Sequence, residues 1–186
     1  LPSQQSSRRH TSVTALASVL ALGLLMSSSV QAAGTVSNVE VNSLSDVTAS
    51  DSNCTLREAI DLINTGTSSP TNAGCTKTDI AVDKKADMAD EKNAITFKPT
   101  LSGTIKLSGS ELSIYKPVNI IGPGADKLTI DGDNKFRIFE IAEGAATGIG
   151  GLTLTKGETY NNGGAIYSNS DLSIIGCTIS WNSAYT

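Results

Sequence analysis

Histidine is almost missing from this chain. The only one, His10, lies near the amino end, in a segment that we expect to be removed. A mature protein without it has no imidazole to serve as a general base, as the partner of a nucleophile or as a metal ligand. A phosphate-binding glycine loop is also missing, because Gly148, Gly150 and Gly151 precede a predicted strand and not a helix. We therefore expect neither a cofactor nor a metal.

Charged and aromatic residues are scarce as well. Charged residues make up 17% of the sequence and aromatic residues 4%, whereas there are 17 glycines. No basic stripe is present to meet a phosphate backbone, so we expect no nucleic-acid partner. The net charge of −4 also disfavours binding to anionic membranes. Few aromatic residues and many glycines favour thin strands and many turns over a bulky globular core.

The one long apolar run lies at the amino end. A basic tripeptide at residues 8–10 precedes an apolar stretch over residues 13–26, and small residues follow as far as Ala33. This order is typical of a secretory signal peptide, and cleavage after Ala32 or Ala33 gives residues 1–32 as the signal. An uncleaved anchor is the alternative, although the run is short for a permanent membrane span. We expect an exported chain with no transmembrane span after cleavage.

Apolar residues recur in the second half of the chain at intervals of 24 and 25 residues. Alternation over so few residues, between Asn, Ser, Asp and Gly, is typical of short half-buried strands. A fixed period of this length indicates a solenoid. We predict an all-β fold, a single-stranded parallel β-helix over residues 93–186 with three short strands per turn. Its inward-facing residues should form two columns, Leu128–Leu152–Cys177 and Ile130–Leu154–Ile179.

Residues 33–92 are predicted to form an amino-terminal unit with a strand over residues 36–42 and one helix. Thr55 and Glu58 have the spacing of a capping box at a helix start, and Gly66 is typical of a helix end. We expect the helix to cover the open first turn, because uncovered strand edges invite edge-to-edge pairing. Its apolar face should consist of Leu56, Ala59, Ile60 and Ile63.

The cysteines predict one disulfide. Cys54 and Cys75 are the natural pair after export, because they bracket a loop rich in Asn, Thr, Ser, Gly and Pro that needs tethering. Cys177 is left over, and its place in an apolar column predicts a buried free thiol, with a reactive or intermolecular cysteine as the alternative.

Residues 76–93 are charged and poor in apolar residues. We predict a solvated loop or a short exposed helix there, and a specific binding loop is the alternative.

Carboxylates are the remaining candidates for chemistry. Asp131 and Asp133 leave one turn of the predicted coil, and Glu140 and Glu143 lie near the next. Two carboxylates that flank a sugar bond can perform acid–base catalysis, which makes Asp131 and Asp133 weak catalytic candidates. The sequence around them is also an ordinary turn sequence of Asp, Gly and Asn, and we favour that interpretation. A weak calcium site is the third.

Two motifs resemble known families. Cys54–Ile60 (CTLREAI) resembles the signature of the CSLREA domain, with Thr55 in place of the usual serine, and Ile121–Gly132 looks like the linker and strand that follow it. Gly163–Ile166 (GGAI) and Ile179–Asn182 (ISWN) are similar to the paired GGAI and FxxN motifs of polymorphic outer membrane protein repeats, with isoleucine in place of phenylalanine. The resemblance implies a right-handed β-helix on a secreted or outer-surface bacterial protein, often adhesin-like, with no assigned reaction.

Three functions stay open at this point. The favoured one is a non-catalytic secreted or cell-surface module that binds or displays, with glycans or host or cell-surface proteins as partners. The second is a carbohydrate-active enzyme, a polysaccharide lyase or glycoside hydrolase, whose active site lies beyond this stretch. The third is a structural stalk without a ligand. Because the sequence stops directly after a complete unit, we expect the β-helix to be incomplete at its carboxyl end and the native protein to continue.

Overall fold

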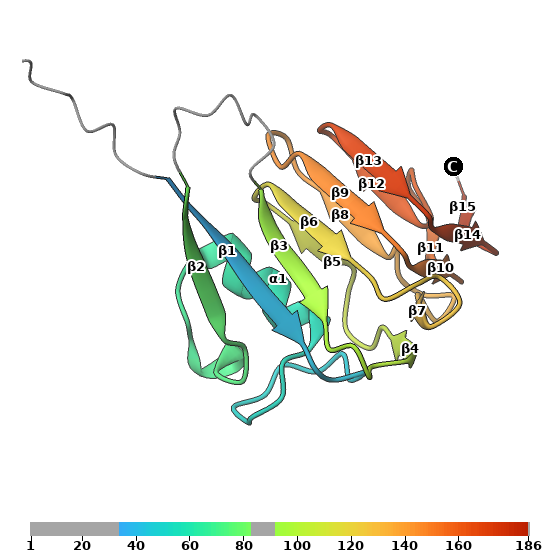
Figure 1. The fold of residues 1–186 in the computed structure, drawn as a ribbon. Coiled ribbons are helices and arrows are strands. Elements are labelled where there is room, and N and C mark those ends of the chain that lie inside the picture. The colour runs from blue at the N-terminus through green and yellow to red at the C-terminus, as the bar shows by residue number, and fades with distance from the viewer. Residues whose placement is uncertain (1–33, 83–91, 186) are drawn as a thin grey trace, which may run out of the picture. The chain divides into compact units, whose positions relative to one another are not determined.

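The computed structural model describes residues 34–82 and 92–185. Over these residues the chain forms a parallel β-solenoid of about four turns with a single α-helix, as predicted (Figure 1). None of the helices in these two ranges is long and apolar enough to cross a membrane. The predicted signal peptide, residues 1–32, lies outside the described residues, as do residues 83–91 of the expected loop.

Within the two described ranges, fifteen short strands form the sheets of the solenoid. Six of them make sheet A, in the order β13-β9-β6-β3-β1-β2; sheet B has the order β14-β10-β7-β4, sheet C has the order β12-β8-β5, and β11 pairs with β15. All pairs are parallel except that of β1 with β2. The strands are β1 (Gly34–Val41), β2 (Lys77–Val82), β3 (Asn93–Phe97), β4 (Gly103–Lys106), β5 (Leu112–Ile114), β6 (Val118–Ile121), β7 (Leu128–Asp131), β8 (Phe139–Ile141), β9 (Thr147–Gly150), β10 (Thr153–Thr155), β11 (Glu158–Thr159), β12 (Ile166–Ser168), β13 (Leu172–Ile175), β14 (Thr178–Ser180) and β15 (Ser183–Ala184).

Strand register confirms the stacking of both predicted columns. Leu154 of β10 pairs with Ile130 of β7 on one side and with Ile179 of β14 on the other. Leu154 and Ile130 are completely buried, and a fully buried side chain of this size contributes about 1.5–3 kcal/mol. The second column continues the same register one position earlier and contains Leu128 at the start of β7, Leu152 just before β10 and Cys177 just before β14.

The prediction of a buried thiol at Cys177 was wrong. This free cysteine is only half-buried, and Ile179 beside it is 46% exposed. Both side chains face inward, but no coil in the described part of the chain stacks on the far side of β13 and β14. Their columns therefore cover them from one side only. The Cys177 thiol donates weakly to the carbonyl oxygens of Ile149 and Ile175, each 3.6 Å from its sulfur.

The predicted helix is confirmed as α1 (Leu56–Thr65). Thr55 accepts the Glu58 backbone N–H at 3.2 Å, and the Glu58 carboxylate accepts the Thr55 backbone N–H at 2.9 Å, which completes the capping box. Gly66 ends the helix with a φ of 74°, a left-handed conformation that glycine adopts without strain. The apolar face is buried as predicted, with Leu62 added to Leu56, Ala59, Ile60 and Ile63.

Side chains of α1 close the exposed edge of β5, the first strand of sheet C. The Asn64 side-chain amide donates to the carbonyl of Ser113 at 2.9 Å, and its oxygen accepts the backbone N–H of Tyr115 at 2.8 Å. Arg57 donates to the carbonyls of Ser110 and Glu111, at 2.7 and 3.1 Å. The helix therefore covers the first turn, as predicted, and it also replaces the hydrogen bonds that another strand would supply.

The prediction of a solvated loop or exposed helix over residues 76–93 was wrong at its start. Residues Lys77–Val82 form β2, which runs antiparallel to β1 and covers the outer edge of sheet A. An uncovered edge strand exposes unpaired backbone groups, and this pairing removes that row from β1. The expected disulfide joins Cys54 to Cys75 just before β2. Closing this 21-residue separation is worth about 3 kcal/mol in the chain-entropy model.

Candidate functional site

Asp131, the first of the two weak catalytic candidates, is fixed inside a turn. Its side chain is buried, and one carboxylate oxygen lies 2.9 Å from the Lys156 ammonium. The other oxygen accepts the backbone N–H of Asp133 at 2.8 Å. Both carboxylate oxygens therefore have strong partners, one within the turn and one on the next coil, which supports the structural interpretation over the catalytic one.

Asp133, the second candidate, lies between two lysines. The ammonium groups of Lys106 and Lys135 are each 2.6 Å from its carboxylate. The hydrogen bond from Lys106, followed by that from Lys135, holds the pKa of Asp133 below its ordinary value. Asp133 and Asn134 have φ values of 59° and 51°, in the left-handed region that Asp and Asn tolerate. This environment keeps the carboxylate ionised and unsuited to donating a proton.

The two glutamates of the next turn lie apart from this aspartate pair. Glu143 is exposed in the turn after β8. Glu140, on the outward face of β8, lies 3.9 Å from the guanidinium of Arg137. Arg137 in turn binds Glu111 at 2.6 Å. The structure thus brings Glu140 together with Glu111 and Arg137, and sequence reasoning missed both of these partners.

Glu111 is the titratable group of this cluster whose environment is most unusual. Burial of its carboxylate raises its pKa, and so do the hydrogen bond and negative charge of Glu140, whereas Arg137 acts in the opposite direction. The sequence did contain a signal for this cluster. Glu111 lies directly before β5 and Arg137 lies two residues before β8. The register of these strands puts Glu111 opposite Ile138, so the repeat applied to the residues before each strand would have placed Arg137 within one position of Glu111.

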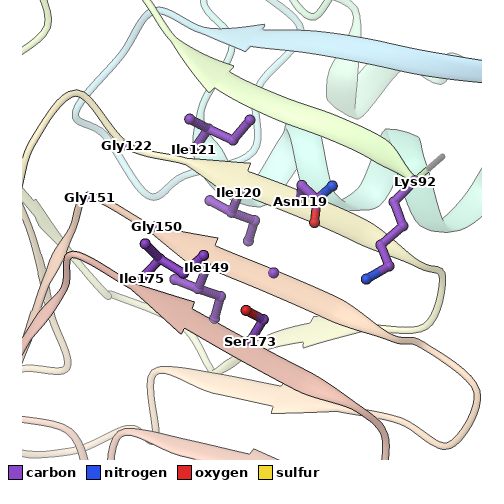
Figure 2. Close-up of a pocket in the computed structure, with 11 residues that line it drawn as sticks. Lys92, Asn119, Ile120, Ile121, Gly122, Ile149, Gly150, Gly151, Ser173 and Ile175 are labelled. Carbon is purple, nitrogen blue, oxygen red and sulfur yellow. The ribbon is translucent and has the colours of Figure 1, made fainter. Parts of the chain in front are cut away.

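A trough runs along β9 on the outer face of sheet A (Figure 2). Its floor is the backbone of β9, whose outward positions are Gly148 and Gly150 and carry no side chain. The flanking strands β6 and β13 form its walls, and the hollow has a volume of about 490 Å³. The wall residues are Asn119 and Ile121 on β6, and Ser173 and Ile175 on β13.

The trough has a polar end and an apolar end. Register aligns Asn119, Gly148 and Ser173 at one end, and Ile121, Gly150 and Ile175 at the other. Figure 2 shows the Lys92 side chain extending to the polar end. Ile121 and Ile175 are exposed although they are large and apolar.

The two glycines of the floor differ in how much room the structure leaves for a side chain. A side chain on Gly148 would collide with the side-chain oxygen of Asn119. At Gly150 an added Cβ would meet only the Ile175 carbonyl oxygen, at 3.4 Å, which is ordinary van der Waals contact. The φ of Gly150 is not positive, so its backbone also accepts other residues. Packing therefore does not require glycine at Gly150, although glycine is what leaves the trough open.

Comparisons of the chain with family models, with curated proteins and with solved structures found no match. The resemblance to CSLREA domains and to polymorphic outer membrane protein repeats therefore stays a prediction. The function has to be argued from the surface of the solenoid itself.

Proposed function

We propose that this protein is an exported, non-catalytic binding module of the adhesin-like kind, and that it holds a linear glycan in the trough on sheet A. The observation that carries this proposal is the open floor at Gly148 and Gly150, between the walls that β6 and β13 form. A volume of about 490 Å³ falls within the range of roughly 300–1,000 Å³ that small-molecule sites have.

The lining of the trough suits binding better than catalysis. Its side chains are aliphatic, amide or hydroxyl groups, and Lys92 is the one ionisable residue among them. General acid–base catalysis of glycosidic cleavage needs two carboxyl groups across the bond, and the lining contains none. The carboxylates of Asp131 and Asp133, by contrast, are held in ion pairs on the turn after β7.

A sugar chain matches the two-ended character of the trough. A pyranose ring presents apolar C–H groups on its faces and hydroxyl groups on its edge. Ile121 and Ile175 offer apolar contact at one end, while Asn119 and Ser173 offer hydrogen-bond donors and acceptors at the other. Because both walls are parallel strands, a linear chain can lie along β9 between them.

Export is supported by the disulfide between Cys54 and Cys75, because such bonds persist mainly in oxidising compartments. The amino-terminal sequence, with its basic, apolar and small-residue regions, points the same way. The proposed location is therefore the extracellular space or the outer surface of a bacterial cell.

Filling the trough tests the proposal. Gly150→Leu places a side chain over the floor without backbone strain, and Thr104→Leu adds a similar side chain at an exposed outward position of β4, on sheet B. A panel of linear glycans is screened against the unmodified chain, and the best binder is measured by titration calorimetry. We expect Gly150→Leu to weaken binding by about tenfold or more, which corresponds to losing about 1.4 kcal/mol of contact, and Thr104→Leu to leave it unchanged.

Three results would contradict the proposal. The first is an unmodified protein that binds none of the linear glycans. The second is equal affinity in the unmodified chain and in Gly150→Leu. The third is release of shortened sugar products during incubation with the bound glycan, which would favour the enzyme hypothesis instead.

A further inference from the structure

A second hollow lies away from the trough, on the turns that lead from sheet B to sheet C. Its volume is about 360 Å³. Three successive coils contribute to it, through the residues before β5, the residues before β8, and β11 with the residues that follow it. We call it the turn cleft. Its lining residues that matter below are Ser110, Glu111, Arg137, Glu158, Tyr160 and Asn161.

An aromatic ring forms one wall of the turn cleft. Tyr160 is 80% exposed, so its ring is accessible to a ligand. Its neighbour on the next coil is Tyr185, with ring centroids 5.6 Å apart and planes tilted by 36°. The parallel pairing of β11 with β15 and the hydrogen bond from the Tyr185 N–H to the Thr159 carbonyl, 3.0 Å, align the two rings. The Tyr160 ring is thus held in place before any ligand arrives.

The opposite side of the turn cleft is rigid and polar. The Arg137 side chain is only 9% exposed and donates to the carbonyls of Gly163 and Asn162, at 3.1 and 3.0 Å. Its guanidinium also forms ion pairs with Glu111 at 2.6 Å and with Glu140 at 3.9 Å, and lies 5.2 Å from the centre of the Tyr167 ring. Glu111 is therefore fixed in position and still 30% exposed, so it can accept hydrogen bonds from a ligand.

The cations that line the turn cleft are paired, whereas one of its carboxylates, that of Glu158, has no cation partner in the described part of the chain. Both lining cations have carboxylate partners, Arg137 with Glu111 and Lys135 with Asp133. Among the described residues, no cation lies within ion-pair distance of Glu158. Asn161 and Ser110 add neutral donors and acceptors. A ligand that fits has hydroxyl groups that can donate to the carboxylates, one apolar face and no negative charge.

We propose that the turn cleft is a second binding site, which takes an uncharged pyranose residue. The apolar face of the sugar stacks on the Tyr160 ring, and its hydroxyl groups bond to Glu111, Glu158 and Asn161. This site shares no residue with the trough, so it does not depend on the glycan proposed there. A glycan with a side branch or a chain end engages the two sites separately.

The test removes the aromatic wall. Tyr160→Ala is compared with Tyr160→Phe, which keeps the ring, and with Tyr115→Ala, which removes a tyrosine that is 59% exposed outside the cleft. The probes are cellohexaose and N-acetylated chitohexaose, both uncharged, followed by NMR chemical-shift titration of the full chain in 20 mM and 300 mM NaCl. We expect Tyr160→Ala to weaken binding by up to about tenfold, and Tyr160→Phe and Tyr115→Ala to keep it, because ring stacking contributes about 0.5–1.5 kcal/mol. The affinity should be the same at both salt concentrations.

The outcomes separate this proposal from the previous one. In Gly150→Leu the shifts of the turn cleft should persist, while any shifts of β9 should need at least about tenfold more oligosaccharide. The proposal is overturned if neither uncharged oligosaccharide shifts the resonances of Tyr160 and Asn161, or if Tyr160→Ala and Tyr115→Ala bind alike. Hexalysine is added as a cationic control probe. The proposal is also overturned if only hexalysine binds there and 300 mM NaCl releases it, because this would identify a site for cations. Circular dichroism of each variant confirms that the solenoid is intact.

Discussion

At the residue scale, Arg137 connects three coils of the solenoid. It lies on one coil, binds Glu111 from the coil before it, and donates to the carbonyls of Asn162 and Gly163 on the coil after it. A cation this deeply buried is tolerated because every side of its guanidinium has a partner. Those partners place Glu111 at the edge of the turn cleft, next to the second acid, Glu140.

The first prediction concerns the pKa of Glu111. Glu140→Gln removes a negative charge and a carboxylate partner, so the pKa of Glu111 should fall towards its ordinary value, with burial as the remaining cause of its elevation. A raised pKa means that the folded state binds more protons than the unfolded state between the two pKa values. Stability therefore decreases as pH rises through that window, and Glu140→Gln should make this decrease smaller.

Carbon-13 NMR titration of the glutamate carboxyl groups measures this pKa directly, and urea unfolding at several pH values measures its consequence. Glu143→Gln is the matched control, since Glu143 is an exposed glutamate on the same coil. If the pKa of Glu111 stays unchanged in Glu140→Gln, burial alone raises it and the two acids do not interact.

At the element scale, helix α1 acts as the amino-terminal cover of the solenoid. Its start and end could be predicted because capping chemistry is local: Thr55, Glu58 and Gly66 each act within one helical turn. The role of Asn64 could not, because its partners in and after β5 are about 50 residues away in sequence. No local pattern in the sequence indicates that the Asn64 side chain takes the place of a missing strand.

The second prediction tests that role. Asn64→Ala leaves the Ser113 carbonyl and the Tyr115 N–H without their partner, and an unsatisfied buried group costs about 1–3 kcal/mol. Because both groups lie near solvent, we expect a loss of about 1–2 kcal/mol in the free energy of unfolding. Asn64→Asp keeps the acceptor for the Tyr115 N–H and should lose less. Urea denaturation gives both values, and an Asn64→Ala protein as stable as the unmodified chain would contradict the capping role.

Other elements show where sequence reasoning stops. Strand β2 was missed because its partner β1 is about 40 residues away and its charged surroundings resemble a solvated loop. The trough was missed for a related reason. Gly148 and Gly150 were expected to precede a strand, but they lie within β9, and only the register of β6, β9 and β13 shows that they face outward between two walls. The inward residues could be predicted from their period in the sequence. The surroundings of the outward residues could not, because they depend on neighbours that are distant in sequence.

At the scale of the whole molecule, the solenoid is a stack in which each coil packs only on its neighbours. An inner coil is covered on both faces by neighbouring coils. The last described coil, which contains β13 and β14, is covered on one face only. In such a stack, stability is close to a sum of nearest-neighbour interfaces. Position along the stack should therefore decide how much a core residue contributes, even among residues of the same column.

The third prediction compares two residues of one column. Leu154→Ala empties a fully buried position between Ile130 and Ile179 and should cost about 2–5 kcal/mol of unfolding free energy. Ile179→Ala lies next to it in register but starts 46% exposed, so it should cost less than about 1.5 kcal/mol, roughly half or less of the burial value of such a side chain. Equilibrium urea unfolding provides both numbers.

Amide hydrogen exchange then decides whether the coils behave as separate neighbours. If they do, Ile179→Ala speeds exchange in β14 and leaves β7 unaffected, because the last coil opens without its inner neighbours. Leu154→Ala lies between the two strands and should speed exchange in both β7 and β14. If Ile179→Ala instead speeds amide exchange equally in all strands, the solenoid opens only as one unit. Nearest-neighbour packing would then not explain the difference between inner and terminal coils.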